Sequence, residues 1–361
     1  MANPLVSVVM GTYNHATLVK EALNSVLSQD FTNFEFLVSD DGSKDGTPDI
    51  VATYTDARLQ FTSNAVNRGA ALVLNELVGK ARGRYIAIIN SDDAWMPGKL
   101  SEQVSILEKH ANIGAVFGRV EFIDREGRTI AKEDLGFGQV FDRKNRSRGQ
   151  WMRYFFERGN CLCHPSVLIR KDIYDLIGLY DNSLRQLPDF DMWIRVVKRA
   201  DIFVSPNKMV RFRIMPGENT SSDTYVNRVR TLNEHFFIAR GFFSGVSADI
   251  LRQGFGDLLR YPELPTDAHV EIEKALLFLQ PVLGLTHVYQ IVALMRLREL
   301  LADRSCRGVL GADYDFNDRS LHRLAAEADG LQREIVETKS PESNRTIRHR
   351  LARTVRRFIC R

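Results

Sequence analysis

The chain has 361 residues, 44% of them hydrophobic and 26% charged, a balance that excludes intrinsically disordered and fibrous proteins. The formal net charge of +4 is unevenly placed, because residues 339–361 carry eight Lys or Arg against one acid. The other 338 residues sum to −3, which argues against a nucleic-acid-binding body.

The N-terminal third alternates short, β-rich apolar runs with amphipathic stretches, the pattern of βαβ units. We predict strands at Val6–Met10, Phe34–Ser39, Arg58–Thr62, Arg84–Ile89 and Ala115–Val120. Between them we predict helices at Leu18–Ser28, Pro48–Tyr54, Ala70–Ala81 and Pro97–His110. The alternation favours an α/β fold with a mostly parallel sheet and helices on both faces.

The pattern is less regular after Gly127 and becomes helical after residue 225. We predict a loop at Gly136–Gln150, a strand at Pro165–Arg170, a helix at Met192–Arg199 and a strand at Ile202–Arg213. Later helices are predicted at Arg228–Phe243, His269–Leu279, His287–Leu301 and Arg319–Thr338. We therefore expect an α/β domain over residues 1–225, a helical domain over 226–338 and a basic tail over 339–361.

The stretch Ala275–Met295 has 21 residues without a formal charge, about the length of a transmembrane helix. It also contains Pro281 and Gly284. We predict two buried helices broken at these residues rather than a membrane span.

The four cysteines predict no disulfide framework, and Cys161-x-Cys163 has neither redox nor zinc-ribbon spacing. The first residues lack the basic start of a signal peptide. We expect a cytoplasmic protein, and one at the cytoplasmic face of the membrane if the basic tail binds lipid.

Polar residues follow three of the predicted strands. They form the segments Gly11-Thr12-Tyr13-Asn14, Asp40-Asp41-Gly42-Ser43 and Asn90-Ser91-Asp92-Asp93. Ligands of open α/β sheets bind at the carboxyl ends of the strands, and a hard cation such as Mg²⁺ or Mn²⁺ would compensate clustered carboxylates there. The alternative is that these acids only form turns or cap helices.

The chain has no P-loop and no strand-linked Gly-x-Gly-x-x-Gly, so nucleotide hydrolysis of the P-loop type and Rossmann hydride transfer are not expected. The segments above, together with Asn67-Arg68-Gly69 and Asp92-Asp93-Ala94-Trp95-Met96-Pro97, resemble family 2 glycosyltransferases of the GT-A fold. The resemblance covers roughly residues 4–215. It implies a mostly parallel, mixed sheet with flanking helices, followed here by a helical C-terminal region.

The resemblance also implies roles for residues at the sheet edge. Asp40 would accept a hydrogen bond from the nucleotide base, and Asp92 would hold Mg²⁺ or Mn²⁺ through the second position of a D-x-D element. The first position of that element is Asn90, an amide where the family usually has an acid. The implied nucleotide-binding residues are Thr12, Asn14, Asp40, Asp41, Asn67, Arg68, Asn90 and Ser91.

The run Pro188-Asp189-Phe190-Asp191-Met192-Trp193 resembles the acceptor-site element of the family. On that resemblance Asp189 is the general base that takes a proton from the acceptor hydroxyl, while Asp191 has a structural or supporting role. The alternative is that either acid caps the helix that begins here. Further supporting candidates are Asp93, His164 and Arg213, the last facing the diphosphate.

We therefore expect an inverting, metal-dependent glycosyltransferase that moves a sugar from a nucleotide-sugar donor to a saccharide or lipid-linked acceptor, in cell-surface polysaccharide or glycolipid synthesis. The alternatives are a sugar-phosphate nucleotidyltransferase and a non-catalytic carbohydrate-binding relative. Residues 344–361 would form a basic amphipathic helix that binds an anionic membrane surface. Nucleic acid is not expected as a partner.

Overall fold

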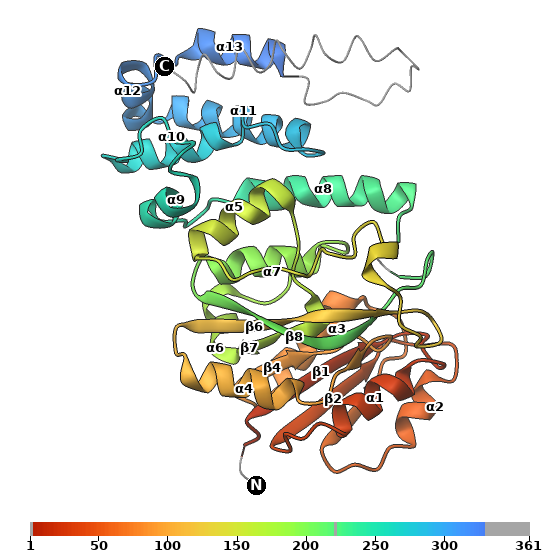
Figure 1. Ribbon diagram of the computed structural model, residues 1–361. Helices are drawn as coiled ribbons and strands as arrows, with labels where there is room; N and C mark the ends of the chain where they lie inside the picture. The colour runs from red at the N-terminus through yellow and green to blue at the C-terminus, as the bar shows by residue number, and fades with distance from the viewer. Residues whose placement is uncertain (1–2, 220–221, 329–361) are drawn as a thin grey trace. The chain divides into compact units, whose positions relative to one another are not determined.

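The computed structural model describes residues 3–219 and 222–328 (Figure 1). These residues form two compact units, one within 3–148 and 159–228 and one within 149–158 and 229–328. Residues 149–158, which we expect in the first domain, group with the helical unit. The tail at 339–361 and the end of the helix predicted at Arg319–Thr338 lie outside the described residues.

The first unit is built on a mixed sheet, which within the described residues has eight strands in the order β3-β2-β1-β4-β7-β6-β8-β5. Its strands are β1 (Val6–Thr12), β2 (Phe34–Asp40), β3 (Leu59–Ser63), β4 (Tyr85–Ile88), β5 (Ala94–Trp95), β6 (Ile113–Ile123), β7 (Leu168–Arg170) and β8 (Asp201–Arg213). The parallel pairs are β3-β2, β2-β1, β1-β4 and β6-β8. The predicted mostly parallel sheet is confirmed.

Helices cover this sheet because its central strands are apolar on both faces. All seven residues of β2 are buried, as expected for a strand between two helical layers. The covering helices are α1 (Val19–Leu27), α2 (Thr47–Ala52), α3 (Ala70–Lys80), α4 (Lys99–Lys109), α6 (Lys171–Ile177) and α7 (Pro188–Val197). The amphipathic stretches predicted between the strands are thus helices.

Strand β7 runs against its neighbours, and this reversal shapes the functional edge. It pairs antiparallel with β4, with Ala87 opposite Leu168, and antiparallel with β6. Residues that precede β7 therefore lie at the edge where β4 ends. The segment 160–166 is brought beside Asn90–Asp93 in this way.

The second unit is helical. It contains α9 (Ala248–Phe255), α10 (Asp267–Leu277), α11 (Thr286–Ala302), α12 (Arg304–Ala312) and α13 (Asp318–Glu327), together with all of α5 (Arg148–Arg158) after residue 148 and all of α8 (Tyr225–Gly241) after residue 228. The ring of Phe156 packs against Phe242, Phe243, Phe255, Phe278 and Tyr289 with centroids 4.6–5.7 Å apart. This aromatic cluster explains why α5 groups with helices far along the chain.

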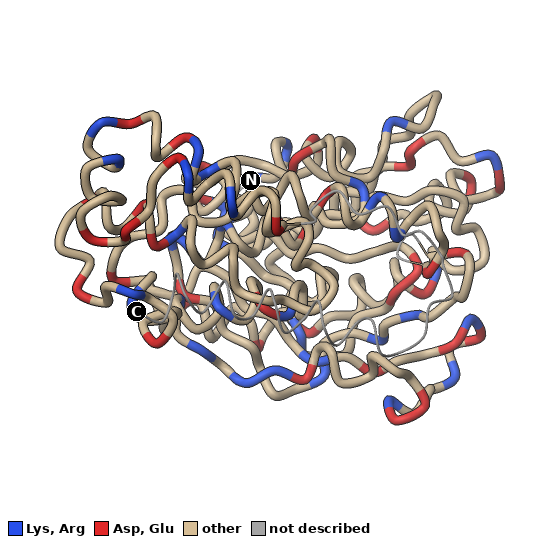
Figure 2. The backbone as a smooth tube through the Cα atoms, turned by 90° about the horizontal axis from the view of Figure 1, so that it is seen from above, with Lys and Arg blue, Asp and Glu red and all other residues tan. Residues whose placement is uncertain are grey.

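The uncharged stretch 275–295 is divided between α10 and α11, with Gly284 at a φ of 78° in the turn between them. This confirms the predicted break. Among the described helices, none is long and apolar enough to cross a membrane. Acidic and basic residues are interspersed along the described chain of both units (Figure 2).

Candidate active site

The loop after β1 is fixed to the loop after β2 by short polar contacts. Asn14 has a φ of 54°; its backbone N–H donates to Ser43 Oγ at 2.8 Å, and its Oδ1 accepts from the Lys44 N–H at 2.8 Å. His15 Nδ1 lies 2.7 Å from Ser91 Oγ. The first and third polar segments are thus joined, as predicted for residues at one sheet edge.

Asp40 is a fully engaged carboxylate. It is 0% exposed, and its oxygens accept hydrogen bonds from the N–H groups of Gly42 and Ser43 and from the hydroxyls of Ser43 and Ser63. Four hydrogen bonds occupy about all the acceptor sites of a carboxylate. A donor from a nucleotide base would have to displace one of these hydrogen bonds. In this structure Asp40 stabilises the turn after β2, as in the alternative that the acids of this segment form turns.

Asp41 holds the loop before α3. Its oxygens accept from the backbone N–H groups of Arg68 and Gly69, both at 2.9 Å, and from Asn64 Nδ2 at 3.3 Å. The Arg68 side chain pairs with Glu76, and Asn67 is exposed. Asp41 therefore positions Asn67 and Arg68 at the edge rather than presenting a free carboxylate.

Thr12 ends β1 with an unsatisfied hydroxyl. It is 3% exposed, and its Oγ1 is buried with no hydrogen-bond partner among the described residues. Native proteins leave few buried polar atoms unpaired. The hydroxyl therefore marks a place where a polar ligand group would gain a hydrogen bond.

The segment after β4 contains one buried acid and one accessible acid. Asp93 is 2% exposed and accepts from the Arg213 N–H at 2.8 Å and from Asn90 Nδ2 at 3.0 Å. Burial, and then the charge of Asp92, hold the pKa of Asp93 well above its ordinary value. Asp93 thus joins β8 to this segment through its hydrogen bond with Arg213.

Asp92 is half-buried, and only one of its oxygens accepts a hydrogen bond among the described residues, from Asn219 Nδ2 at 3.3 Å. No group of three or more metal-ligating side chains occurs in the described ranges. Mg²⁺ is often bound by one or two carboxylates with substrate phosphates completing the shell. The Asp92 carboxylate fits that mode of binding and does not fit an all-protein metal cage.

Arg213 does not occupy the predicted place facing a diphosphate. Its side chain is 1% exposed and pairs with Glu21. Its guanidinium also donates to the backbone oxygens of Asp92, Asp124 and Arg125 at 2.7–2.8 Å. With its donors committed to protein acceptors, Arg213 fixes the Asp92 backbone instead of binding phosphate.

Asp189 lies in the first turn of α7 but does not act as the N-cap of this helix. The helix begins after Leu187 with no side-chain cap. One Asp189 oxygen accepts from Asn160 Nδ2 at 2.7 Å and the other from the Phe190 N–H at 2.8 Å. Burial raises the pKa of Asp189 to about 6, although the Asn160 hydrogen bond opposes the rise. A carboxylate tuned toward neutral pH is suited to proton transfer.

Asp191 has a structural contact. It pairs with Arg195 at 2.8 Å, one turn along α7. Arg195 in turn donates to the backbone oxygens of Ile177, Gly178 and Leu179. This pair secures the loop that leads to α7.

His164 lies in a buried wall that it shares with Tyr180. Its Nε2 lies 3.1 Å from the Tyr180 hydroxyl, and burial lowers the pKa of His164 to about 4, so the imidazole is neutral at physiological pH. Asn75 of α3 fixes the same wall by bonding to both backbone groups of Tyr180 at 2.8–2.9 Å. His164 therefore lies beside the site with its ring held by the Tyr180 hydroxyl.

The two sides of the site meet near Cys163. Burial raises the pKa of the Cys163 thiol well above its ordinary value, and the carboxyl groups of Asp93 and Asp189 raise it further. The thiol thus lies within electrostatic range of both acids. The sequence did not predict that Cys163, Asn160, Asn219 and Asn75 belong to the site. Cys163 and Asn160 could have been found from their position just before the strand predicted at Pro165–Arg170, if that strand had been expected to pair antiparallel with its neighbours.

Comparisons with known proteins agree with the fold. The glycosyl transferase family 2 model matches residues 7–176. A structure of TarS residues 1–349 from S. aureus in complex with UDP-GlcNAc has a TM-score of 0.58 at 19% identity, covering 81% of this chain and 80% of that one. The mixed sheet with its flanking helices and acidic edge is therefore that of a GT-A glycosyltransferase.

Two curated sequences identify the family. An uncharacterized glycosyltransferase, MJ1057, of Methanocaldococcus jannaschii is 32% identical over 64% of this chain and 76% of its own length. The UDP-Glc:alpha-D-GlcNAc-diphosphoundecaprenol beta-1,3-glucosyltransferase WfgD of Escherichia coli is 34% identical over 56% of this chain and 73% of its own length. The chain belongs to glycosyl transferase family 2 and is a glycosyltransferase, which sets aside the nucleotidyltransferase alternative.

Proposed function

We propose that this enzyme transfers a sugar with inversion from a nucleotide-sugar donor to a saccharide or lipid-linked acceptor, in cell-surface polysaccharide or glycolipid synthesis. The observation that carries the proposal is the presence of two different acids at the site. Asp92 is accessible, and Asp189 has a pKa raised to about 6. The name of WfgD, with its UDP-Glc donor and diphosphoundecaprenol acceptor, supports a UDP-sugar and a polyprenyl-diphosphate-linked sugar as the first substrates to test.

In the proposed reaction, the donor base and ribose lie at the ends of β1 and β2. The unpaired Thr12 hydroxyl would bond to the nucleoside, and Asn14, Asn67 and Asn90 offer further amide groups. The loops that carry them are held by Asp40 and Asp41. The nucleotide is thus recognised mainly by neutral hydrogen-bonding groups on a rigid edge.

The diphosphate lies next to Asp92, which would bind Mg²⁺ or Mn²⁺ together with the phosphate oxygens. When bound, the ion neutralises charge that develops on the leaving diphosphate. Because Arg213 is committed to protein acceptors and Arg68 pairs with Glu76, we expect metal dependence to be strong.

Asp189 would take the proton of the acceptor hydroxyl as its oxygen attacks the anomeric carbon. The new bond forms on the face opposite the bond to the diphosphate, which breaks and releases the nucleoside diphosphate. Asn160 orients the Asp189 carboxylate through its 2.7 Å hydrogen bond. The neutral His164 and Tyr180 are hydrogen-bonded to each other beside the segment that contains Asn160.

The test is a screen of nucleotide sugars for thermal stabilisation, with and without Mn²⁺, followed by transfer to a polyprenyl-diphosphate sugar. We expect stabilisation by one class of donor, larger with Mn²⁺, and an inverted product by NMR of the new linkage. A retained linkage would contradict the inverting mechanism. Donor binding without transfer to the polyprenyl-diphosphate sugar would contradict the proposed class of acceptor.

We also propose that the basic segment 339–361, which lies outside the described residues, recruits the enzyme to an anionic membrane surface on the cytoplasmic side. Each Lys or Arg near such a surface contributes roughly 1 kcal/mol. Co-sedimentation with vesicles of increasing anionic lipid content should separate the full chain from one that ends at Lys339. Equal pelleting of the two proteins would reject this role.

A further inference from the structure

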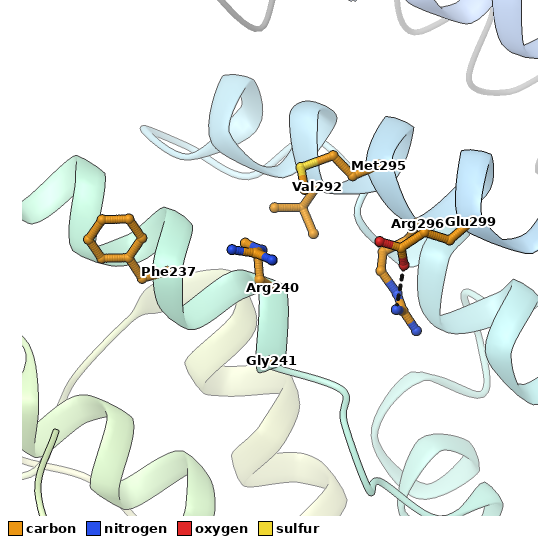
Figure 3. Close-up of a pocket in the computed structure, with 7 residues that line it drawn as sticks. All are labelled: Phe237, Arg240, Gly241, Val292, Met295, Arg296 and Glu299. Atoms are coloured by element: carbon orange, nitrogen blue, oxygen red, sulfur yellow. Dashed lines mark hydrogen bonds and ion pairs between the residues drawn. The ribbon is translucent and has the colours of Figure 1, made fainter.

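Lys99 of α4 is a buried amine without an acidic partner. It is 0% exposed and forms no ion pair with any residue that the structure describes. Arg296, by contrast, pairs with Glu299 at 2.7 Å beside a pocket of about 270 Å³ in the helical unit (Figure 3). Burial lowers the pKa of Lys99 well below its ordinary value, and burying an amine costs free energy that an apolar side chain of the same length would not. The role of Lys99 therefore lies in the contacts of its amine.

The amine of Lys99 has three neighbours in the interior of the first unit. Its Nζ lies 4.1 Å from the centroid of the Trp95 ring, a distance at which an ammonium is attracted to the ring face. It also donates to Gln103 Oε1 at 2.7 Å and to the backbone oxygen of Val167 at 3.4 Å. Hydrogen bonds are directional, so these contacts fix positions in a way that apolar packing does not.

The side chains of Trp95, Lys99 and Gln103 hold three successive backbone oxygens, those of residues 165–167. Trp95 Nε1 donates to the first at 3.0 Å, Gln103 Nε2 to the second at 2.7 Å and Lys99 Nζ to the third at 3.4 Å. We call these three side chains the Lys99 cluster. The sheet pairing of β7 begins only at Leu168, so the stretch before it is held by side chains.

The Lys99 cluster connects the two stretches of chain that carry the reaction. Trp95 directly follows Asp92-Asp93-Ala94. On the other side, Ser166 Oγ donates to the backbone oxygen of Cys163 at 2.7 Å, and the same stretch begins with Asn160, whose amide donates to Asp189. All of these residues belong to the first unit. A shift of residues 165–167 would therefore move Asn160 relative to Asp92.

We infer that Lys99 is a positioning residue of the transfer reaction, which with Trp95 and Gln103 sets the place of Asn160 relative to Asp92. The inference rests on the proposed role of Asp189 as the general base. Transfer requires the acceptor oxygen, the anomeric carbon and the leaving diphosphate to be aligned, and a misplacement of about 1 Å can cost about 10²-fold in rate. Lys99 acts on this alignment from the interior, without touching either substrate.

The test uses the full chain, with the donor and acceptor selected by the screen proposed above. Lys99→Met keeps an unbranched side chain of similar length and removes the N–H donors. Val104→Ala, a truncation at another buried position of α4, controls for lost packing. Trp95→Phe keeps an aromatic ring and removes only the Nε1 donor. Thermal unfolding and donor binding establish which variants are folded.

We expect Lys99→Met to lower kcat about tenfold or more and to change the KM for the donor less than about twofold, because alignment is lost while the donor-binding edge is kept. Val104→Ala should lower the melting temperature and leave kcat near that of the parent. Trp95→Phe should lower kcat by a smaller factor than Lys99→Met. In an Asn160→Ala background, Lys99→Met should cost less than about twofold, since residues that act through one network are not additive.

The inference would be overturned by a Lys99→Met variant with the kcat of the parent, or with no greater loss than Val104→Ala. A change confined to the KM for the donor, or an equal loss with and without Asn160, would also overturn it. If Lys99→Met does not fold, a normal kcat for Trp95→Phe has the same meaning. Failure of the proposed function is distinguishable, because Asp189→Asn and Asn160→Ala would then both transfer like the parent.

Discussion

The acids after β2 and the acids that face the proposed reaction differ in how many hydrogen bonds they accept. Asp40 and Asp41 accept four and three, mainly from backbone N–H groups of the loops they hold. Asp92 accepts one from the described residues, and Asp189 accepts two and has its pKa raised to about 6. Motif likeness groups these four acids together, but their contacts separate acids that build the edge from acids left with capacity for substrate.

Among the variants considered, Asp92→Ala should lose the most transfer activity. If Asp92 holds the cation at the diphosphate, transfer should fall about 10³-fold with the fold intact, because the leaving group loses its charge compensation. EDTA should abolish transfer by the parent enzyme, and Mn²⁺ should restore it. The control is Asp172→Ala, which removes an exposed acid of α6. Full transfer in EDTA would contradict the assignment.

The next largest effect is expected for Asp189→Asn. The amide keeps the shape but takes no proton, so transfer should fall roughly 10²-fold or more while donor binding survives. The variant should be no less stable at pH 8, since a carboxyl whose folded pKa is raised loses stability as the pH rises through that value. Asp191→Asn, in the same helical turn, is the control. Normal transfer by Asp189→Asn would return this acid to a structural role.

Asp41→Ala tests the other side of the comparison. It leaves the N–H groups of Arg68 and Gly69 without their acceptor, so we expect a loss of about 2–3 kcal/mol in the free energy of unfolding. Urea unfolding measures this loss, with the exposed Asp49→Ala as control. Wild-type stability together with a large loss of transfer would show that Asp41 belongs with the acids that meet substrate.

The smallest expected effect is that of Asn160→Ala on pH dependence. Transfer by the parent should rise with pH through about 6, as Asp189 ionises. Without the Asn160 hydrogen bond, which lowers the pKa of Asp189, the rise should move to higher pH, so the variant loses more activity at pH 6 than at pH 8. Asn112→Ala, which removes a contact with Asp201, should leave the profile unmoved.

The sequence predicted the parallel half of the sheet well because each strand there is a short apolar run followed by an amphipathic helix. It predicted β8 as Ile202–Arg213, against Asp201–Arg213 in the structure. It missed α5, where a Gly- and Arg-rich stretch favoured a loop and the aromatic residues around Phe156 decided otherwise. It also missed the two-residue strand β5, which forms by pairing with β8.

For the site, residue types and order predicted which acids gather at the edge but not what each one contacts. The hydroxyl of Thr47, at the start of α2, accepts from the His15 N–H at 2.9 Å and so holds the loop after β1. Arg213 seemed free to meet phosphate, yet its side chain is buried. Such partners lie far away in sequence, and no local pattern specifies them.

The long sequence separation between contacting residues of the site has a consequence for how the enzyme folds. The site depends on contacts between Asn75 and Tyr180, Asp93 and Arg213, and Asp92 and Asn219, which are 105, 120 and 127 residues apart. Pairings over such separations form slowly, because a long loop must close before they are rewarded. The β1–β4 half can assemble early during synthesis. The contacts around Asp92 cannot be completed until residue 219 has left the ribosome, so a nascent chain can fold its β1–β4 half before the site is complete.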